Sequence, residues 1–354
     1  MKKLREGYTT GTCLTAASLA SVLWQKEGVM PEKAAVDTPS GKTLVLNVCG
    51  YEKYTCGVKK YAGDDPDVTD GCVVKASVSV FKDDGEISFK AGEGIGVVTR
   101  KGLKLPPGEP AVNPVPRQMV CDALRPVIGN RRAEVTVSVP GGDRIAEKTF
   151  NPRLGIEGGI SILGTSGIVR PMSEEAVRES LAQELSMCRA EYGSRTAFVT
   201  GYSGEEFVRA NFTEIPSVVL CSNHLGFLLD EALELGFTDI LIAGGMGKLV
   251  KPAAGIMNLH SHTAGGQREI FCTHSSLAGA SQETVRKIYS CTTTKEMCSV
   301  LKEEKLYSQV LDSVVRAAAE NCRLRVLGKI NISFILLDEK NEIAAQYGIN
   351  SVGD

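Results

Sequence analysis

The sequence predicts an α/β protein of two domains, and three observations support this prediction. The chain has 354 residues, about twice the length of a typical domain. The N-terminal part alternates short apolar runs with turns, which is typical of an α+β domain with mostly antiparallel strands. The C-terminal part repeats strand, loop and helix about every 21 residues, which indicates a Rossmann-like, doubly wound parallel sheet. We place the boundary near Gly193, which gives domains 1–193 and 194–354.

The N-terminal domain is expected to begin with a helix over about 13–27, capped by Thr12 and ended by Gly28. Two hairpins should follow. One turns at 83–85 into a strand through Ile87, and the other turns at 140–143 between strands 134–139 and 145–150. Two segments rich in Gly and Pro, 92–116 and 151–171, interrupt the strands, and loops of this length inside a domain are usually functional.

A helix over about 174–192, with Val177, Leu181 and Cys188 facing inward, leads into the C-terminal domain. The expected strands are 196–200, 217–221 and 239–243, and the helix after the second strand covers 224–235. Further helices are expected over about 282–289, 295–304 and 306–321, followed by a hairpin of 330–338 with 342–347.

Charge and cysteine content exclude several classes of protein. The 40 basic and 42 acidic residues give a net charge of −2, which argues against a general nucleic-acid or membrane-surface binder. No apolar run approaches the roughly 18 residues of a membrane helix. The eleven cysteines include no Cys-x-x-Cys, which favours reduced thiols in a cytoplasmic protein.

The strongest local charge asymmetry covers residues 240–268, which contain no Asp or Glu. The segment starts at the carboxyl end of a predicted strand, where open α/β sheets bind their ligands. It therefore predicts a cationic crevice for an anionic ligand, although ordinary turns with chance charge spacing remain an alternative. Its candidate anchors are Lys248, Lys251 and Arg268. The candidate residues at this and the neighbouring strand ends are Gly201, Ser222, Asn223, Gly244, Gly245 and Gly247.

Three further motifs have both a functional and a structural interpretation. Gly7-Tyr8-Thr9-Thr10-Gly11-Thr12 enters a helix and could hold an anion, although it lacks the Lys-Ser/Thr ending of a Walker A motif; a simple helix cap is the alternative. Residues 64–71 hold four carboxylates that could bind a cation or move a proton, or form a solvated acidic turn. Residues 92–96, with Glu93 and Gly94, follow a strand as a nucleotide loop would, or form a tight turn.

The four histidines lie within 224–274, but their spacing does not favour zinc. His260-x-His262 and Cys272-x-His274 lack the helical spacing of a metalloprotease, and no Cys-x-x-Cys completes a structural site. We therefore expect no protein-bound metal.

The motifs together resemble one family, the corrin-ring C1-methyltransferases of anaerobic cobalamin biosynthesis, which act on cobalt-precorrin-5B. The resemblance runs from residue 7 to about 270, and two departures occur, Asp70 and Gly245, where the family commonly has His. The segments that carry it are Gly7-Tyr8-Thr9-Thr10-Gly11-Thr12-Cys13, 64–71, 92–99, Gly102-Leu103, 108–117, 151–167, Gly247-Lys248-Leu249-Val250-Lys251 and Gly255-Ile256-Met257-Asn258.

This resemblance implies methyl transfer from S-adenosylmethionine to C1 of cobalt-precorrin-5B, giving cobalt-precorrin-6A, with cobalt present only in the substrate. Acetate and propionate arms of the tetrapyrrole would need basic and hydroxyl partners. The substrate-binding candidates are Thr9, Thr12, Arg117, Arg153, Lys248, Lys251 and Arg268. The catalytic candidates are Thr10, Asp65 and Asp67. The donor candidates are either the strand-end residues, with Asn223 in place of an acid, or Glu93 with Gly94.

Two other functions fit the same residues. A non-catalytic tetrapyrrole carrier of the same pathway could use the acid-free segment for binding alone. A phosphotransferase could use Thr10-Gly11-Thr12 as an anion cradle. Homo-oligomers and transient contacts with neighbouring pathway enzymes are both compatible with the sequence, and neither nucleic-acid nor membrane partners are expected.

Overall fold

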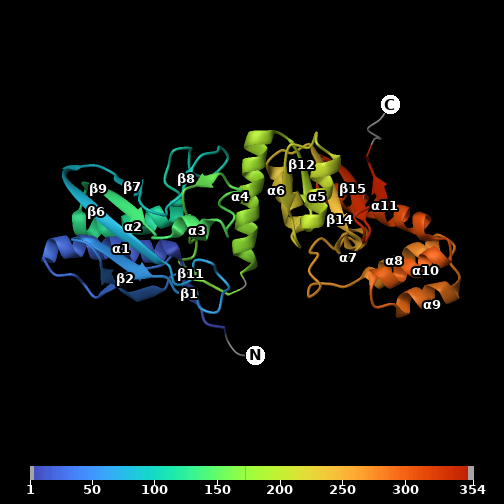
Figure 1. Cartoon of the computed structure of the whole chain (residues 1–354), viewed down its shortest axis with the longest axis horizontal. Coiled ribbons are helices and arrows are strands. Elements are labelled where there is room, and N and C mark those ends of the chain that lie inside the picture. Colours follow the sequence, from blue (N-terminus) through green and yellow to red (C-terminus); the bar gives the residue numbers. More distant parts are fainter. Residues whose placement is uncertain (1–3, 172, 350–354) are drawn as a thin grey trace. The chain divides into compact units, whose positions relative to one another are not determined.

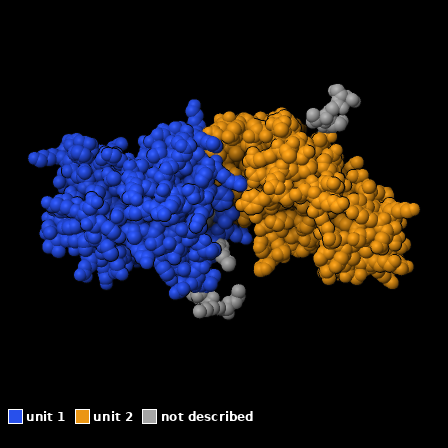
Figure 2. Space-filling view, viewed as in Figure 1, with its two compact units in different colours: residues 1–177 blue, residues 178–354 orange. Residues whose placement is uncertain are grey.

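The computed structural model describes residues 4–171 and 173–349 and divides into two compact units, Met1–Val177 and Arg178–Asp354 (Figure 2). The division falls near the start of helix α4 (Glu174–Tyr192), whereas the sequence pattern placed it near Gly193, at the end of that helix. In the described ranges, no helix is both long and apolar enough to cross a membrane.

Unit 1 contains a five-stranded sheet in the order β4-β5-β6-β9-β7. All its strand pairs are antiparallel except β7 with β9, so the expectation of mostly antiparallel pairing is correct. Paired buried residues such as Ala76 with Val137 and Val78 with Val135 give the central strands β6 and β9 a common apolar face. The strands are β4 (Cys49–Gly50), β5 (Thr55–Lys59), β6 (Val73–Asp84), β7 (Ile87–Ala91) and β9 (Arg131–Ser138).

Both hairpins predicted for this unit are wrong. After the turn at 85–86, β7 does not pair with β6, because β9 lies between them and its backbone pairs with β6 along one edge and with β7 along the other. After β9, the chain turns through Gly141, whose φ of 74° is left-handed, into the short helix α3 (Gly142–Ala146) rather than a strand. Gly142 lies directly against the backbone of Gly94, an approach that favours glycine at this position.

Helix α1 (Thr10–Glu27) packs on β5 and β6 and against α2 (Pro114–Ile128) (Figure 1). Buried Ala16, Ala17 and Ala20 permit this close packing. The cap is Thr9, not Thr12, because the Thr9 hydroxyl accepts a hydrogen bond from the Thr12 N–H. Gly28 ends the helix with a φ of 76°, as predicted. A separate two-stranded sheet of β2 (Lys33–Asp37) and β3 (Thr43–Asn47) completes this layer.

The two segments rich in Gly and Pro pair with each other. β8 (Val97–Val98) pairs with β10 (Ile156–Glu157), and bridges join Ile95 to Ile160 and Val112 to Ile162. The end of the second segment, β11 (Ile168–Val169), pairs with β1 (Gly7–Tyr8). These long segments therefore form ordered backbone contacts beside the start of α1.

Unit 2 contains a five-stranded sheet in the order β13-β12-β14-β15-β16. The first four strands are parallel and β16 is antiparallel to β15, so the predicted closing hairpin is correct. Phe198, Ile242 and Phe334 belong to one core cluster, and their neighbours Val199, Ala243 and Ile335 belong to another. The strands are β12 (Arg195–Val199), β13 (Val218–Leu220), β14 (Asp239–Gly245), β15 (Asn331–Leu337) and β16 (Ile343–Tyr347).

Helices connect these strands along the chain. α8, α9 and α10 form one group beside α11 (Figure 1). In α4, Leu181 and Cys188 are buried as predicted, but Val177 is 42% exposed, because the packed face of the helix begins one turn later. The helices are α5 (Tyr202–Asn211), α6 (Leu225–Glu234), α7 (Met246–Leu249), the 3-10 helix η1 (Lys251–Ala254), α8 (Gln267–Leu277), α9 (Gln282–Ser290), α10 (Thr294–Glu303) and α11 (Tyr307–Arg325).

Candidate functional site

The threonines at the start of α1 bind the chain itself. The Thr10 hydroxyl donates to the Leu163 carbonyl and accepts from the Leu163 N–H, and the Thr12 hydroxyl donates to the Gly167 carbonyl at 2.7 Å. The Gly11 N–H donates to the same Leu163 carbonyl at 2.9 Å. The helix N-terminus therefore holds the chain's own carbonyl group where the phosphotransferase alternative would need an anion.

The acidic segment is likewise used in internal contacts. Asp67 forms an ion pair with Lys60, whose side chain is 2% exposed, and also accepts hydrogen bonds from the Thr69 N–H and hydroxyl. Burial alone would raise the pKa of Asp67, but the Lys60 charge and these hydrogen bonds outweigh burial and hold the pKa below its usual value. Asp64 pairs with Arg5, and Asp70 accepts from the Ala62 N–H. Asp67 is therefore a weak base, while Asp65 is half-buried in the same segment.

The glycines of 92–96 allow close backbone packing. A Cβ on Gly94, whose φ is 69°, would overlap the Val139 carbonyl oxygen, and one on Gly159 would overlap Gly94. Glu93 is exposed, and its carbonyl accepts from the Val139 N–H at 2.7 Å. The space beside Gly94 that a nucleotide loop would leave for its ligand is thus filled by neighbouring backbone.

Arg117 fixes the loop before α2. Its guanidinium donates to the carbonyls of Val112 and Pro110 and to the Glu109 carboxylate at 2.8 Å, and it lies over the Phe89 ring. Arg153 is half-buried in the second segment rich in Gly and Pro. Arg117 therefore has most of its donors engaged within its own unit, and Arg153 also interacts with other residues.

The carboxyl ends of the parallel strands in unit 2 bring several predicted residues to one edge of the sheet. Gly201 follows β12, Ser222 and Asn223 follow β13, and Gly245 ends β14. A Cβ at Gly201 or Gly245 would meet nothing within 4 Å, so both face open space. Ser222 has a φ of 51°, and backbone strain of this kind is concentrated at functional sites.

Two other predicted donor residues differ in their surroundings. Gly244 lies against Thr200, where a Cβ would overlap the threonine hydroxyl, so its role is close packing. Gly247, in α7, faces open space and its carbonyl accepts from the Gln267 side chain at 3.0 Å.

Burial raises the pKa of Cys221, the residue after β13, to about 12, so this thiol stays protonated.

The paired lysines after β14 differ from each other. Lys251 is 1% exposed, and its ammonium group donates to the carbonyls of Leu259 and Ala264, both at 2.9 Å. Burial, together with the charge of Lys248, lowers its pKa. The prediction that Lys251 anchors a substrate carboxylate is wrong, because the side chain is buried within its own loop. Lys248 is half-buried and has no ion-pair partner among the described residues.

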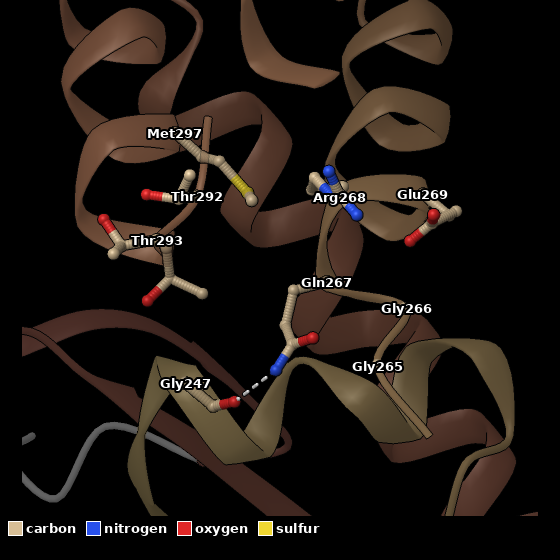
Figure 3. Close-up of a pocket in the computed structure, with 10 residues that line it drawn as sticks. Gly247, Gly265, Gly266, Gln267, Arg268, Glu269, Thr292, Thr293 and Met297 are labelled. Carbon is tan, nitrogen blue, oxygen red and sulfur yellow. Dashed lines mark hydrogen bonds between the residues drawn. The ribbon is translucent and has the colours of Figure 1, made fainter. Parts of the chain in front are cut away.

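A cavity of about 730 Å³ lies beside the end of β14. Figure 3 shows Met297 and Thr293 on one side of it, opposite Gln267 and Arg268, with Gly247 below. Arg268 lies over the Tyr289 ring, 5.3 Å from its centre. The cavity therefore contains two predicted residues, Gly247 and Arg268. The complete lining set is Gly247, Gly265, Gly266, Gln267, Arg268, Glu269, Thr292, Thr293, Thr294 and Met297.

The histidines are dispersed. His260 and His262 form an edge-on ring pair 5.0 Å apart, while His274 is buried against the Ser313 hydroxyl at 2.7 Å. Burial lowers the pKa of His274, so it is neutral at pH 7. Within the described ranges, no three His, Cys, Asp or Glu side chains converge as they would around a metal ion.

Comparison with known proteins identifies the family. A CbiD family model matches residues 1–171, and a model of the CbiD C-terminal domain matches residues 258–348. A curated relative from Thermoanaerobacter sp. (strain X514), named cobalt-precorrin-5B C(1)-methyltransferase, is 42% identical over 98% of this chain and 96% of its own. This chain belongs to the CbiD family.

Two further proteins are similar to this chain. The relative from Photorhabdus laumondii, with the same name, is 42% identical over 92% of this chain and 88% of its own. A crystal structure described as cobalamin biosynthesis protein (cbiD) from Archaeoglobus fulgidus is 33% identical, covers 74% of this chain and 83% of that chain, and gives a TM-score of 0.40.

In this CbiD chain, the sequence pattern missed Gln267, Glu269, Thr292, Thr293 and Met297. Glu269 is the first residue after the acid-free run 240–268, so the charge pattern that indicates Arg268 does not include it. Thr292 and Thr293 precede a predicted helix, and their capping role with Glu296 is all that the sequence indicates. Only the three-dimensional approach of α8 and α10 reveals them as cavity residues.

Proposed function

We propose that this chain is a cobalt-precorrin-5B C(1)-methyltransferase that uses S-adenosylmethionine and forms cobalt-precorrin-6A in the cytoplasm. The observation that carries the proposal is the 42% identity, over 98% of this chain, to a relative of that name. S-adenosylmethionine supplies an electrophilic sulfonium methyl group, which an electron-rich ring carbon can attack in line. The protein's task is therefore to align two large ligands and exclude water.

We place the methyl donor in unit 2, taken as a Rossmann-like domain. Four parallel strands and open space at Gly201, Gly245 and Gly247 support this placement. The rival position at Glu93 and Gly94 is less suitable, because neighbouring backbone occupies the space beside Gly94.

For the tetrapyrrole carboxylates we propose Lys248 as the anchor in unit 2. Lys248 is half-buried, forms no ion pair among the described residues and lies in the run 240–268, which contains no Asp or Glu in sequence. No proton-transfer role is assigned to Thr10 or Asp67, because the first is bound to Leu163 and the second to Lys60. The weak basicity of Asp67 leaves Asp65 as the acidic candidate for that role.

The test is a single-turnover reaction of the full chain with cobalt-precorrin-5B and methyl-deuterated S-adenosylmethionine. Mass spectrometry should show one labelled methyl group on the macrocycle and an equal amount of S-adenosylhomocysteine, with neither product when the tetrapyrrole is omitted. A tetrapyrrole that binds tightly and stays unmodified would overturn the proposal and favour a carrier.

A further inference from the structure

We propose that the cavity between α8 and α10 holds the amino-acid end of the methyl donor, with Arg268 binding its carboxylate and Glu269 its ammonium group. This inference rests on the proposed function for the identity of the donor. It assigns to the donor an arginine that the sequence pattern gave to the tetrapyrrole.

The size and position of the cavity fit this role. Its volume of about 730 Å³ lies within the roughly 300–1,000 Å³ of small-molecule sites. Gly247 lies in α7, separated from the last residue of β14 only by Met246, so the cavity adjoins the carboxyl edge of the parallel sheet. A ligand seated here can extend towards the open space beside Gly245.

The charges of the lining residues favour a zwitterion over a polyanion. Arg268 and Glu269 are exposed and adjacent, and neither side chain forms a hydrogen bond or ion pair with another described residue. A tetrapyrrole with many carboxylates would gain from Arg268 but be repelled by Glu269. An α-amino acid presents one carboxylate and one ammonium group, so it matches both.

The two helix starts at the cavity indicate where the carboxylate binds. Helix α10 is closed by a capping box, in which Thr293 accepts from the Glu296 N–H and Glu296 accepts from the Thr293 N–H. Helix α8 begins after Gly266 with no side-chain cap. Its free N–H groups therefore add to Arg268 as partners for an anion, while Met297 lies on the opposite side of the cavity.

Isothermal titration of the full chain with S-adenosylmethionine, with and without cobalt-precorrin-5B, tests the assignment. Arg268→Met and Glu269→Gln should each raise the donor Kd by about 10- to 150-fold, the effect of losing one charged hydrogen bond. The matched controls are Arg286→Met and Glu283→Gln on the neighbouring helix α9, outside the cavity lining, which should leave the donor Kd unchanged. Decarboxylated S-adenosylmethionine should bind wild type and Arg268→Met equally, yet still respond to Glu269→Gln.

The outcomes separate this inference from the function on which it rests. A wild-type chain that methylates the tetrapyrrole while both variants bind the donor normally would overturn the inference alone. A variant that weakens tetrapyrrole binding instead of donor binding would also overturn it, because the cavity would then belong to the macrocycle. A wild-type chain that neither binds the donor nor forms methylated product would overturn the proposed function itself.

Discussion

Thr10 and Leu163, 153 positions apart in the chain, are joined by a reciprocal pair of hydrogen bonds. The Thr10 hydroxyl donates to the Leu163 carbonyl at 3.2 Å and accepts from the Leu163 N–H at 2.9 Å. Thr10 is 4% exposed, so water cannot readily replace either bond. The threonine-rich start of α1 therefore attaches the 151–171 segment to the rest of unit 1.

Thr10→Val should consequently lower stability rather than catalysis. Losing the part-buried hydrogen bonds between Thr10 and Leu163 should cost about 0.5–1.5 kcal/mol, measured by urea unfolding. Thr10→Ser, which keeps the hydroxyl, is the matched control and should unfold close to wild type. Loss of kcat in a Thr10→Val protein of unchanged stability would instead support the catalytic role expected from the sequence.

The Lys60–Asp67 ion pair should give unit 1 an acid-sensitive stability. The pKa of Asp67 is lowered from its usual 3.8 in the folded protein, so its contribution is complete above that value and disappears as the pH falls through the lowered pKa. Asp67→Asn leaves the buried Lys60 without a counter-ion and should cost about 3 kcal/mol at pH 7.

Unfolding by urea at several pH values checks this. The difference between wild type and Asp67→Asn should be constant from pH 5 to 7 and shrink below about pH 4. The double variant Lys60→Met with Asp67→Leu should recover most of the lost stability, since it removes both charges. A difference that persists unchanged to the lowest pH would contradict the ionic account.

Lys251 should also make stability rise with pH, but in the alkaline range rather than the acidic one. Burial lowers its pKa in the folded protein below the usual 10.5, so between the two values the unfolded chain binds more protons. The free energy of unfolding of wild type relative to Lys251→Met should therefore rise as the pH increases through this interval. The neutral amine still has two hydrogens for the carbonyls of Leu259 and Ala264. A relative stability that falls with increasing pH would show that the ammonium form is required.

How far the sequence predicts the structure depends on the range of the interactions. Local signals succeeded: Gly28 ends α1, and the strand–helix rhythm after residue 193 locates β12, β13 and β14. Pairing across long separations failed, because nothing near residues 83–89 shows that β9 will lie between β6 and β7.

The same distinction holds for the candidate sites. The sequence identifies Lys251 as a cation in an acid-free run. Its burial depends on the loop 255–266, whose Leu259 and Ala264 carbonyls accept hydrogen bonds from the ammonium group. The Arg268 environment likewise depends on α10, whose approach to α8 is set by packing in the core of unit 2. Charge patterning can therefore indicate the region of a binding site. Which basic side chains in that region are accessible follows only from the fold.

Two glycines provide a direct contrast between packing and ligand access. Gly94→Ala should fail to fold or unfold at much lower urea, because the added Cβ overlaps the Val139 carbonyl and the φ is 69°. Gly245→Ala meets no atom within 4 Å and has a φ of −70°, so its stability should stay near wild type. If Gly245 borders the donor, the same variant should raise the donor Kd. A stable Gly94→Ala protein would refute the backbone-packing role given to 92–96.

Lys248 and Lys251 offer the sharpest test of substrate anchoring, since they are three residues apart and only one is accessible. Lys248→Ala should raise KM for cobalt-precorrin-5B by roughly 10- to 150-fold, because a charged hydrogen bond contributes about 1.5–3 kcal/mol. The donor Kd should stay unchanged, and the salt dependence of KM should become weaker, since one charge–charge attraction has been removed. Lys248→Arg keeps the charge and should retain most of the affinity. Lys251→Met, by contrast, should act through stability and the position of 255–266. A Lys248→Ala protein with reduced kcat and unchanged KM would show that this lysine acts on the transition state rather than holding the substrate.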